Sequence, residues 1–264
     1  MKSNKLRELL NSNTPSLGTH VASPSPDVVE IIGRTGLIDV VQFLAEYGPY
    51  SLSELDHFGR ALELYGMSGM IKVDRENRSF VAQRAIGSGI QNILFSDVYD
   101  VADVEECVAS VRADTPLSGG SLGSADGRFA GYGLQSGTPE YVQALDECVV
   151  ALMIEKEAAV NDLETLLSVD GVDMVVFGGN DYWMSAGKPG NARNDPNGTR
   201  EVMMHVYRTA LSMGVQPQAA LGGVDQVQAM LDMGIKHFCV GNDYFMIYQW
   251  LNENAGDIRK LLAS

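Results

Sequence analysis

The sequence is poor in cysteine. Only Cys107, Cys148 and Cys239 occur among its 264 residues. The odd number and the absence of any Cys-x-x-Cys pair argue against a disulfide framework and against a zinc site built from cysteines. Each cysteine lies among apolar or helix-forming residues. We therefore expect buried free thiols in a reducing compartment, which indicates a cytoplasmic protein.

Basic residues and long apolar runs are also scarce. Lys and Arg number 19 against 34 Asp and Glu, which gives a formal net charge of -15. Such a charge repels a polyanion, so nucleic acid is not an expected partner. No run of about 18 apolar residues, the length that a membrane-spanning helix needs, is present. The first ten residues carry charges and lack the apolar segment of a secretion signal, so no membrane partner is expected either.

The sequence does contain a regular alternation of strand-like and helix-like segments, which is typical of a parallel α/β protein. Helix starts are marked by Ser25-Pro26 and by a capping box at Ser51-x-x-Glu54. Eight strand-like runs predict a single (β/α)8 barrel domain over residues 1–264. A doubly wound open sheet is the alternative, but no Gly-x-Gly-x-x-Gly motif follows the first run. The runs cover residues 16–21, 38–44, 70–73, 92–95, 149–155, 172–177, 215–221 and 236–240.

Two segments depart from this alternation. Residues 113–137 are rich in glycine and serine and predict a long loop, which in a compact domain is usually functional or disordered. Residues 244–263 have a helical pattern with most of their apolar residues on one face. That last helix is either the eighth helix of the barrel or a helix that packs on a neighbouring subunit, and both interpretations remain open.

In a barrel of this kind, functional side chains come from the C-terminal ends of the strands and from the loops that follow them. Polar residues at the ends of the first six predicted strands are therefore candidates without any assumption about the reaction. They are His20, Glu46, Tyr47, Lys72, Asp74, Asp97, Glu155, Asn180 and Asp181.

Glu155 and Asp181 form the most informative pair, because each follows an apolar strand and the two strands are neighbours. Two carboxylates completed by water are a common way of holding Mg²⁺ or Mn²⁺. No histidine or cysteine flanks them, which disfavours zinc. The alternative interpretation makes Asp181 a helix N-cap and Glu155 a salt-bridge partner of Lys156 or Lys72.

Short motifs along nearly the whole chain resemble the HpcH/HpaI aldolase family, which includes 2-keto-3-deoxyglucarate aldolase, 4-hydroxy-2-oxoheptanedioate aldolase and macrophomate synthase. No single motif is specific, but their order and spacing together are. The motifs are Leu17-Gly18-Thr19, Ser25-Pro26 with Glu30, Glu46-Tyr47-Gly48-Pro49, Met153-Ile154-Glu155, Gly171-Val172-Asp173, Phe177-Gly178-Gly179-Asn180-Asp181, Gly187-Lys188-Pro189-Gly190 and Val240-Gly241-Asn242-Asp243.

This resemblance implies a metal-dependent barrel that breaks or forms carbon–carbon bonds through a pyruvate enolate. It implies that Glu155 and Asp181 bind the metal, which chelates a 2-oxo acid and stabilises the enolate charge. It also implies that backbone N–H groups of Gly178, Gly179 and Asn180 hold a substrate carboxylate. Members of the family commonly form homo-hexamers through their C-terminal helices, so a homo-oligomer is expected.

The chain departs from the family pattern at four positions. Tyr47 replaces the usual catalytic histidine, and Leu44 replaces the aspartate that pairs with that histidine. Lys72 stands where the family has a substrate-binding arginine, and Met153 replaces a glutamine. The resemblance therefore implies a retained metal site whose proton-transfer and substrate-orienting groups have changed.

The remaining candidates have these expected roles. Tyr47, ionising more readily beside Lys72, could act as a general acid or base, or could simply fill the site wall. His20 could take over proton transfer, or could be structural. Lys72 could bind a carboxylate as a point charge, or form a Schiff base if desolvated. Asp97 is a candidate for substrate binding and could pair with Lys72, either as an ion pair that orients it or as a proton relay. Arg128 in the glycine-rich loop could reach a substrate carboxylate or remain solvated.

The sequence thus predicts a carbon–carbon lyase that depends on Mg²⁺ or Mn²⁺ and acts on a small 2-oxo acid through an enolate. A decarboxylase using the same enolate is one alternative. A barrel that has lost its chemistry and serves in binding or assembly is another, favoured by the loss of the histidine–aspartate pair. Retention of Glu155 and Asp181 opposes this second alternative.

Overall fold

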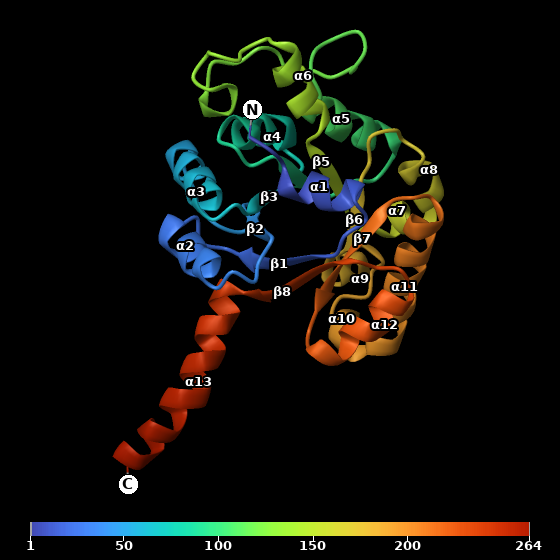
Figure 1. Cartoon of the computed structure of the whole chain (residues 1–264). Coiled ribbons are helices and arrows are strands. Elements are labelled where there is room, and N and C mark those ends of the chain that lie inside the picture. Colours follow the sequence, from blue (N-terminus) through green and yellow to red (C-terminus); the bar gives the residue numbers. More distant parts are fainter. Residues whose placement is uncertain (1, 264) are drawn as a thin grey trace.

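Eight parallel strands close into a barrel in the computed structural model, which describes residues 2–263 (Figure 1). Each strand pairs with the next along the chain, and the last pairs with the first. The predicted barrel is therefore confirmed. The strands are β1 Ser16–Val21, β2 Val40–Leu44, β3 Ser68–Val73, β4 Asn92–Phe95, β5 Val149–Ile154, β6 Met174–Phe177, β7 Gln216–Leu221 and β8 His237–Asn242.

Helices connect the strands and surround the barrel. The predicted capping box is present: Ser51 Oγ accepts a hydrogen bond from Glu54 N, and the Glu54 carboxylate accepts one from Ser51 N. The helices are α1 Lys5–Asn11, α2 Pro26–Arg34, α3 Leu52–Leu64, α4 Arg78–Gly87, α5 Val101–Val111, α6 Pro139–Asp146, α7 Glu157–Asn161, α8 Leu163–Leu167, α9 Gly179–Ser185, α10 Asn191–Asn194, α11 Pro196–Ser212, α12 Val227–Asp232 and α13 Asp243–Leu262, with 3₁₀ turns η1 Arg128–Ala130 and η2 Val224–Gln226.

Sequence signals did not mark every helix, and α1 and α4 show why. The buried face of α4 begins with a charged residue, Arg78, whose guanidinium pairs with Asp103 and Glu106 of α5. A buried arginine interrupts the apolar periodicity by which an amphipathic helix is recognised. In α1 only Leu6 is buried, which leaves too little pattern to indicate a helix.

Successive strand residues point alternately into the barrel and out toward the helices. Inward-facing Val40, Met70 and Leu94 pack in one apolar cluster. On the outer side, Phe43 packs against Phe58 of α3 at a ring-centroid distance of 5.5 Å. This alternation decides which side chains at the strand ends can face a common site at the mouth of the barrel.

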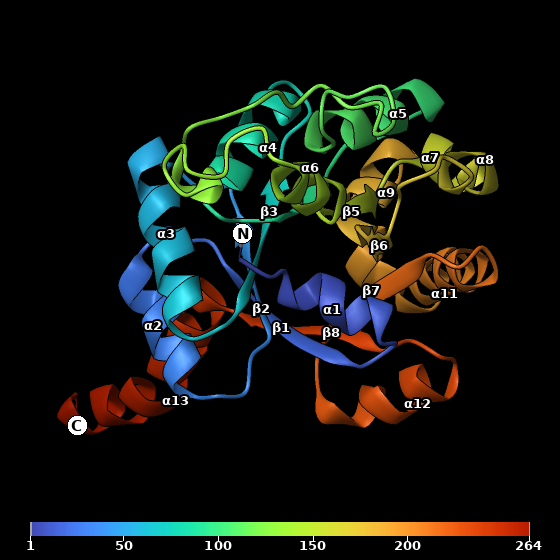
Figure 2. The ribbon, with the colours of Figure 1, turned by 45° about the horizontal axis from the view of Figure 1, so that its top comes forward.

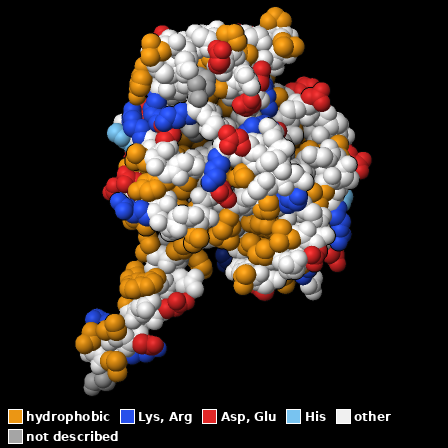
Figure 3. Space-filling model, viewed as in Figure 1, with side chains coloured by type: hydrophobic (Ala, Val, Ile, Leu, Met, Phe, Trp, Pro, Cys, Tyr) orange, Lys and Arg blue, Asp and Glu red, His pale blue; other side chains and the backbone are white. Residues whose placement is uncertain are grey.

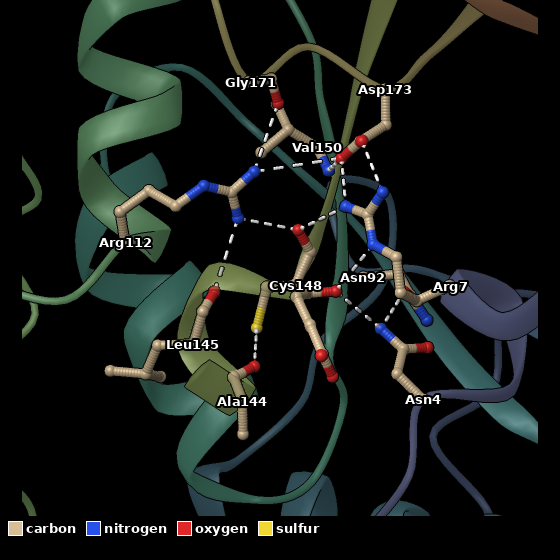
Figure 4. Close-up of polar contacts among 11 residues, drawn as sticks. Asn4, Arg7, Asn92, Arg112, Ala144, Leu145, Cys148, Val150, Gly171 and Asp173 are labelled. Atoms are coloured by element: carbon tan, nitrogen blue, oxygen red, sulfur yellow. Dashed lines mark hydrogen bonds and ion pairs between the residues drawn. The ribbon is translucent and has the colours of Figure 1, made fainter. Parts of the chain in front are cut away.

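Helix α1 lies across the N-terminal end of the barrel (Figure 2). Its Leu6 is fully buried in the inner cluster. Arg7 binds both carboxylate oxygens of Asp173 at 2.6 and 2.7 Å, and Arg112 donates to the carbonyls of Leu145, Cys148 and Gly171 (Figure 4). These contacts close this end of the barrel, so a site for a small molecule is expected at the opposite, C-terminal end.

The last helix, α13, begins at the barrel and then extends away from it (Figure 1). The Asp243 carboxylate fixes its start by accepting hydrogen bonds from Ala22 N at 2.8 Å and Ser23 N at 3.0 Å. Beyond that point the helix leaves large apolar side chains in solvent, including Phe245 at 61% and Trp250 at 62% exposure. Among the described residues, no helix has the length and apolarity needed to cross a membrane.

Candidate active site

Glu155 follows the apolar strand β5 and is 1% exposed. Its Oε1 accepts a hydrogen bond from the backbone N–H of Asp97 at 3.1 Å. Its Oε2 is buried and accepts no hydrogen bond from residues 2–263, but it forms the ion pair with Lys72 that was one alternative for Glu155, at 3.8 Å from Nζ. Burial raises the pKa of Glu155 to about 7, although the nearby charge of Lys72 opposes that shift. A buried carboxylate oxygen without a donor is a position that a cation can fill.

Asp181 lies in the first turn of α9, after an N-cap formed by Gly178. The alternative expectation that Asp181 is itself the N-cap is therefore wrong. Its charge is one of the lesser causes that raise the pKa of Glu155. A Cβ atom at Gly178 would lie 2.6 Å from Glu155 Oε2, so glycine is needed for β6 to end beside that oxygen.

The three residues expected to hold a substrate carboxylate differ in what they offer. The N–H of Gly178 donates to the carbonyl of Ile154 at 3.1 Å, so it is not available to a ligand. Gly179 and Asn180 begin α9, where N–H groups have no acceptor within the helix. Only these two retain a geometry that suits the expected role.

Lys72 is 1% exposed and lies between three polar groups. Its Nζ is 2.5 Å from Glu46 Oε2, donates to Tyr47 Oη at 2.6 Å, and is 3.8 Å from Glu155 Oε2. Burial lowers the pKa of Lys72, but the charge of Glu155 and the contacts with Glu46 and Tyr47 outweigh it and raise the pKa overall. A Schiff base requires a neutral amine, so this arrangement argues against that role for Lys72.

Tyr47 exposes 61% of its surface while its hydroxyl reaches inward to Lys72. Burial of the hydroxyl, aided by Glu46, raises the pKa of Tyr47, and the charge and hydrogen bond of Lys72 do not offset this rise. The expectation that Tyr47 ionises more readily beside Lys72 is therefore wrong, because desolvation of the phenolate dominates. At neutral pH the phenol keeps its proton, and its oxygen accepts a hydrogen bond from Lys72 Nζ. Tyr47 is thus suited to donate a proton.

His20 stands at the end of β1, where it shares the barrel mouth with Lys72. Its Nδ1 lies 3.1 Å from the Gly241 carbonyl oxygen. Burial lowers the pKa of His20, and the charge of Lys72 lowers it further. The imidazole is therefore neutral at pH 7, and a proton on Nδ1 that is donated to Gly241 leaves Nε2 as the basic nitrogen. His20 is suited to accept a proton.

Asp97 does not pair with Lys72 as expected. Its carboxylate forms an ion pair with Lys156, and its backbone N–H supports Glu155. Asp97 adopts a φ of +54°, a left-handed conformation in which few residues other than glycine, asparagine and aspartate are found. The expected relay between Asp97 and Lys72 is thus replaced by a backbone contact that orients Glu155.

This contact leads to a prediction. Asp97→Gly should retain at least half of the wild-type metal affinity, because glycine adopts the same φ and keeps the N–H. Asp97→Ala should lose about 1 kcal/mol of stability through strain, with weaker metal binding. Thermal unfolding and Mn²⁺ titration measure both effects. An equal loss of metal affinity in both variants would show that the carboxylate of Asp97, and not its backbone, supports the site.

Arg128 lies outside this site. Its guanidinium pairs with Glu63 at 2.6 Å and donates to the Ser88 carbonyl at 2.9 Å. Ser88 follows α4 and precedes β4, so these contacts hold Arg128 toward the N-terminal end of the barrel. Within one chain it cannot contact a substrate at Glu155, and the expected role in substrate binding is not supported.

The structure therefore brings Glu155, Asp181, Lys72 and Tyr47 together and adds Glu46, which had been noted only as a polar residue at a strand end. The carboxylates of Glu46 and Glu155 lie within 4 Å of the Lys72 ammonium, and Asp181 places a further carboxylate near Glu155, so carboxylates outnumber the ammonium in this group. The only feature of the sequence that pointed to Glu46 as a site residue was its position immediately before Tyr47. Its function as the partner of Lys72 could not be inferred, because it depends on the distance between two strand ends.

The carboxylates of this group supply only part of the ligands that a divalent cation needs. Among residues 2–263, no group of three or more His, Cys, Asp and Glu side chains could hold a metal by itself. Glu155 and Asp181 would supply two oxygens, and water or substrate would supply the others, as Mg²⁺ and Mn²⁺ accept. The Oε2 of Glu155, which accepts no hydrogen bond, and the excess of carboxylates over ammonium in the group both fit such a cation.

Comparison with known proteins identifies the family of the chain. A family model described as HpcH/HpaI aldolase/citrate lyase matches residues 17–247. A 2-keto-3-deoxy-L-rhamnonate aldolase of Shigella sonnei (strain Ss046) is 25% identical over 251 residues, which cover 95% of this chain and 91% of the relative. The same enzyme of Klebsiella pneumoniae subsp. pneumoniae is 28% identical over 187 residues, covering 70% of this chain and 67% of the relative.

Solved structures share the fold. An HpcH/HpaI aldolase from Desulfitobacterium hafniense DCB-2 has a TM-score of 0.85 at 21% identity, with 97% of each chain covered. The match to the family model confirms the resemblance found in the sequence. Aldolases and citrate lyases both break carbon–carbon bonds, so the prediction of a carbon–carbon lyase is also confirmed. The chain belongs to the HpcH/HpaI aldolase/citrate lyase family.

Proposed function

We propose that this protein is a divalent-metal-dependent lyase that cleaves a 4-hydroxy-2-oxo acid and releases pyruvate or a similar fragment. The observation that carries the proposal is the buried Glu155, whose Oε2 lacks a donor and lies near Asp181 and Lys72. The curated relatives are named 2-keto-3-deoxy-L-rhamnonate aldolase, which supports a substrate of this class.

Glu155 and Asp181 are the residues that would hold Mg²⁺ or Mn²⁺. When bound, the cation would act as a Lewis acid that stabilises the negative charge formed on the 2-oxo group during cleavage. A citrate lyase beta subunit from M. tuberculosis, described as complexed with oxaloacetate and magnesium, has a related fold at a TM-score of 0.56 and 13% identity, covering 88% of this chain and 93% of that chain. Gly179 and Asn180 would offer N–H groups to the substrate carboxylate.

The protein's own residues would move the protons. Neutral His20 would accept the proton of the substrate's 4-hydroxyl group, and the oxygen electrons would form a carbonyl as the C3–C4 bond breaks. The electron pair of that bond would remain on the pyruvate fragment as its enolate. Tyr47 would then donate its proton to C3 of this fragment. Lys72, which contacts Tyr47 Oη, would stabilise the resulting phenolate until solvent returns a proton.

A pyruvate-release assay over a panel of 4-hydroxy-2-oxo acids, with and without EDTA, tests the proposal. Release that EDTA abolishes and Mg²⁺ or Mn²⁺ restores is the expected result. Activity that survives EDTA and is trapped by borohydride would assign the chemistry to a Schiff base on Lys72. No activity across the panel, together with no metal binding by calorimetry, would favour a barrel used for binding or assembly.

We also propose that the whole chain forms one catalytic domain of a cytoplasmic homo-oligomer, with a hexamer as the expected form. Cys107, Cys148 and Cys239 are free and buried, which supports a reducing compartment. Helix α13 supports assembly, because its apolar side chains gather on the segment that extends from the barrel (Figure 3). A patch of this kind on a soluble protein usually contacts another protein, and we assign it to a second copy of this chain.

The assembly can be tested with one double substitution. Ile247→Glu with Trp250→Glu should shift the mass measured by light scattering from the oligomer to smaller species, because charges would be desolvated at the interface. Leu117→Glu is the matched control, since Leu117 is 97% exposed on a loop and its replacement should leave the mass unchanged. A wild-type protein that is monomeric at micromolar concentration would contradict this proposal.

A further inference from the structure

We infer that Glu46 is a positioning residue that holds the Lys72 ammonium away from Glu155, so that Glu155 Oε2 remains available to a divalent cation. The inference rests on the proposed metal site and concerns how this chain controls it. Glu46 does not need to contact the metal or the substrate for this function. It acts through Lys72, the cationic side chain that approaches the unpartnered oxygen.

Three distances define the arrangement. Lys72 Nζ is 2.5 Å from Glu46 Oε2 and 2.6 Å from Tyr47 Oη, but 3.8 Å from Glu155 Oε2. Charge-assisted N–H···O contacts are usually about 2.7–2.9 Å long. The ammonium therefore makes close contacts only with the two consecutive residues of the β2 loop. Its separation from Glu155 is about 1 Å longer than a direct hydrogen bond would need.

The backbone explains why Glu46 can hold Lys72. Lys72 in β3 pairs in register with Leu44, the last residue of β2, and Glu46 follows only two residues later. Glu155 instead follows β5, which is two strands farther around the barrel. Lysine suits this position because its three donors surround a single nitrogen, whereas an arginine would present a rigid planar fork.

The ammonium and a bound cation compete for the same oxygen. The Lys72 side chain is 2% exposed and the Glu155 side chain 1% exposed, so water screens their interaction weakly. If Lys72 moved into direct contact with Oε2, it would neutralise Glu155 and repel a divalent cation. With its Glu46 partner removed, the nearest remaining carboxylate for the ammonium is Glu155. Loss of Glu46 should therefore weaken metal binding through Lys72.

The test is a Mn²⁺ titration of the full-length protein by calorimetry, with free Mn²⁺ followed by electron paramagnetic resonance. Glu46→Gln should lower the affinity by about tenfold or more. Lys72→Met should raise it, because a repelling charge is lost. In the Lys72→Met background, adding Glu46→Gln should change the affinity less than about twofold, since the ammonium on which Glu46 acts is gone.

Glu46→Asp separates positioning from charge. It keeps the negative charge but withdraws the carboxylate by one methylene, so it should lower Mn²⁺ affinity in the wild-type background and not in the Lys72→Met background. Thermal unfolding confirms that each variant is folded. Equal loss on Glu46→Gln in both backgrounds would show a simple charge effect and overturn the inference. Absence of Mn²⁺ binding in the wild-type protein would instead overturn the metal site itself, and the inference with it.

Discussion

Glu155→Gln is expected to abolish Mn²⁺ binding and to lower kcat/KM by about a thousandfold or more. The substitution replaces a charged oxygen by a neutral amide of the same shape. The amide carbonyl can still accept the hydrogen bond from Asp97 N, which Glu155 Oε1 accepts now at 3.1 Å. The loss should therefore arise from the missing negative charge. Calorimetry with Mn²⁺ and the pyruvate-release assay measure the two effects.

Stability should move in the opposite direction from activity. The pKa of Glu155 is raised from its ordinary 4.5 to about 7, so the folded protein holds this proton more tightly than the unfolded chain does. Without metal, Glu155 therefore reduces the free energy of unfolding as the pH rises from about 4.5 to 7. In EDTA at pH 8, Glu155→Gln should melt at the same temperature as the wild type or higher, whereas at pH 4 the two should agree.

A matched control lies two residues away. Glu157 is exposed at the start of α7, and Glu157→Gln should leave metal binding, activity and melting temperature unchanged. Retention of Mn²⁺ binding by Glu155→Gln would reject the proposed metal site. A lower melting temperature of that variant in EDTA at pH 8 would show that the carboxylate stabilises the fold, and that its activity loss could reflect misfolding.

Tyr47→Phe is expected to lower kcat by about a hundredfold or more while changing metal affinity little, because general acid catalysis typically contributes about 10²–10⁴-fold. The phenol is the proposed proton donor, and among the described residues no other hydroxyl accepts a hydrogen bond from Lys72 Nζ. Deuterium incorporation into the methyl group of pyruvate in D₂O measures proton delivery to C3. This incorporation should slow in parallel with kcat.

Two further variants separate the proton donor from the proton acceptor. His20→Asn should slow cleavage of the C3–C4 bond but leave the exchange of pyruvate methyl protons near its wild-type rate. Tyr99→Phe is the control, because Tyr99 stacks its ring on Arg75 and Lys156 at the rim and does not contact Lys72. If Tyr47→Phe were fully active and His20→Asn lost both reactions, His20 alone would carry the proton transfers.

Much of the barrel could be predicted because its signals are local. Apolar runs such as β4 matched their predicted bounds of Asn92–Phe95, and the Ser51 capping box began α3 where expected. Where a signal was not local, prediction failed. The buried face of α4 includes Arg78, whose charge is tolerated only because α5 supplies Asp103 and Glu106. No periodicity within α4 itself could reveal that pairing.

In the candidate site too, the features that depend on local sequence were predictable and the contacts between distant residues were not. That Glu155 and Asp181 would face one rim followed from their places after neighbouring apolar strands, since parallel strands all end on the same side of a barrel. The partners of each side chain did not follow. Asp97 was expected to form an ion pair with Lys72, but its carboxylate pairs with Lys156 instead. Its backbone is left-handed, and its N–H donates to Glu155.

The sequence by itself thus determined the barrel, the family and the order of polar groups around the mouth. All three depend on residue types and spacings that are read along one chain. Only the tertiary structure decided that Lys72 contacts Glu46 and Tyr47 more closely than Glu155, that Tyr47 keeps its proton, and that Arg128 lies away from the site. These outcomes depend on differences of about 1 Å and on desolvation, which arise when segments distant in the sequence are packed together.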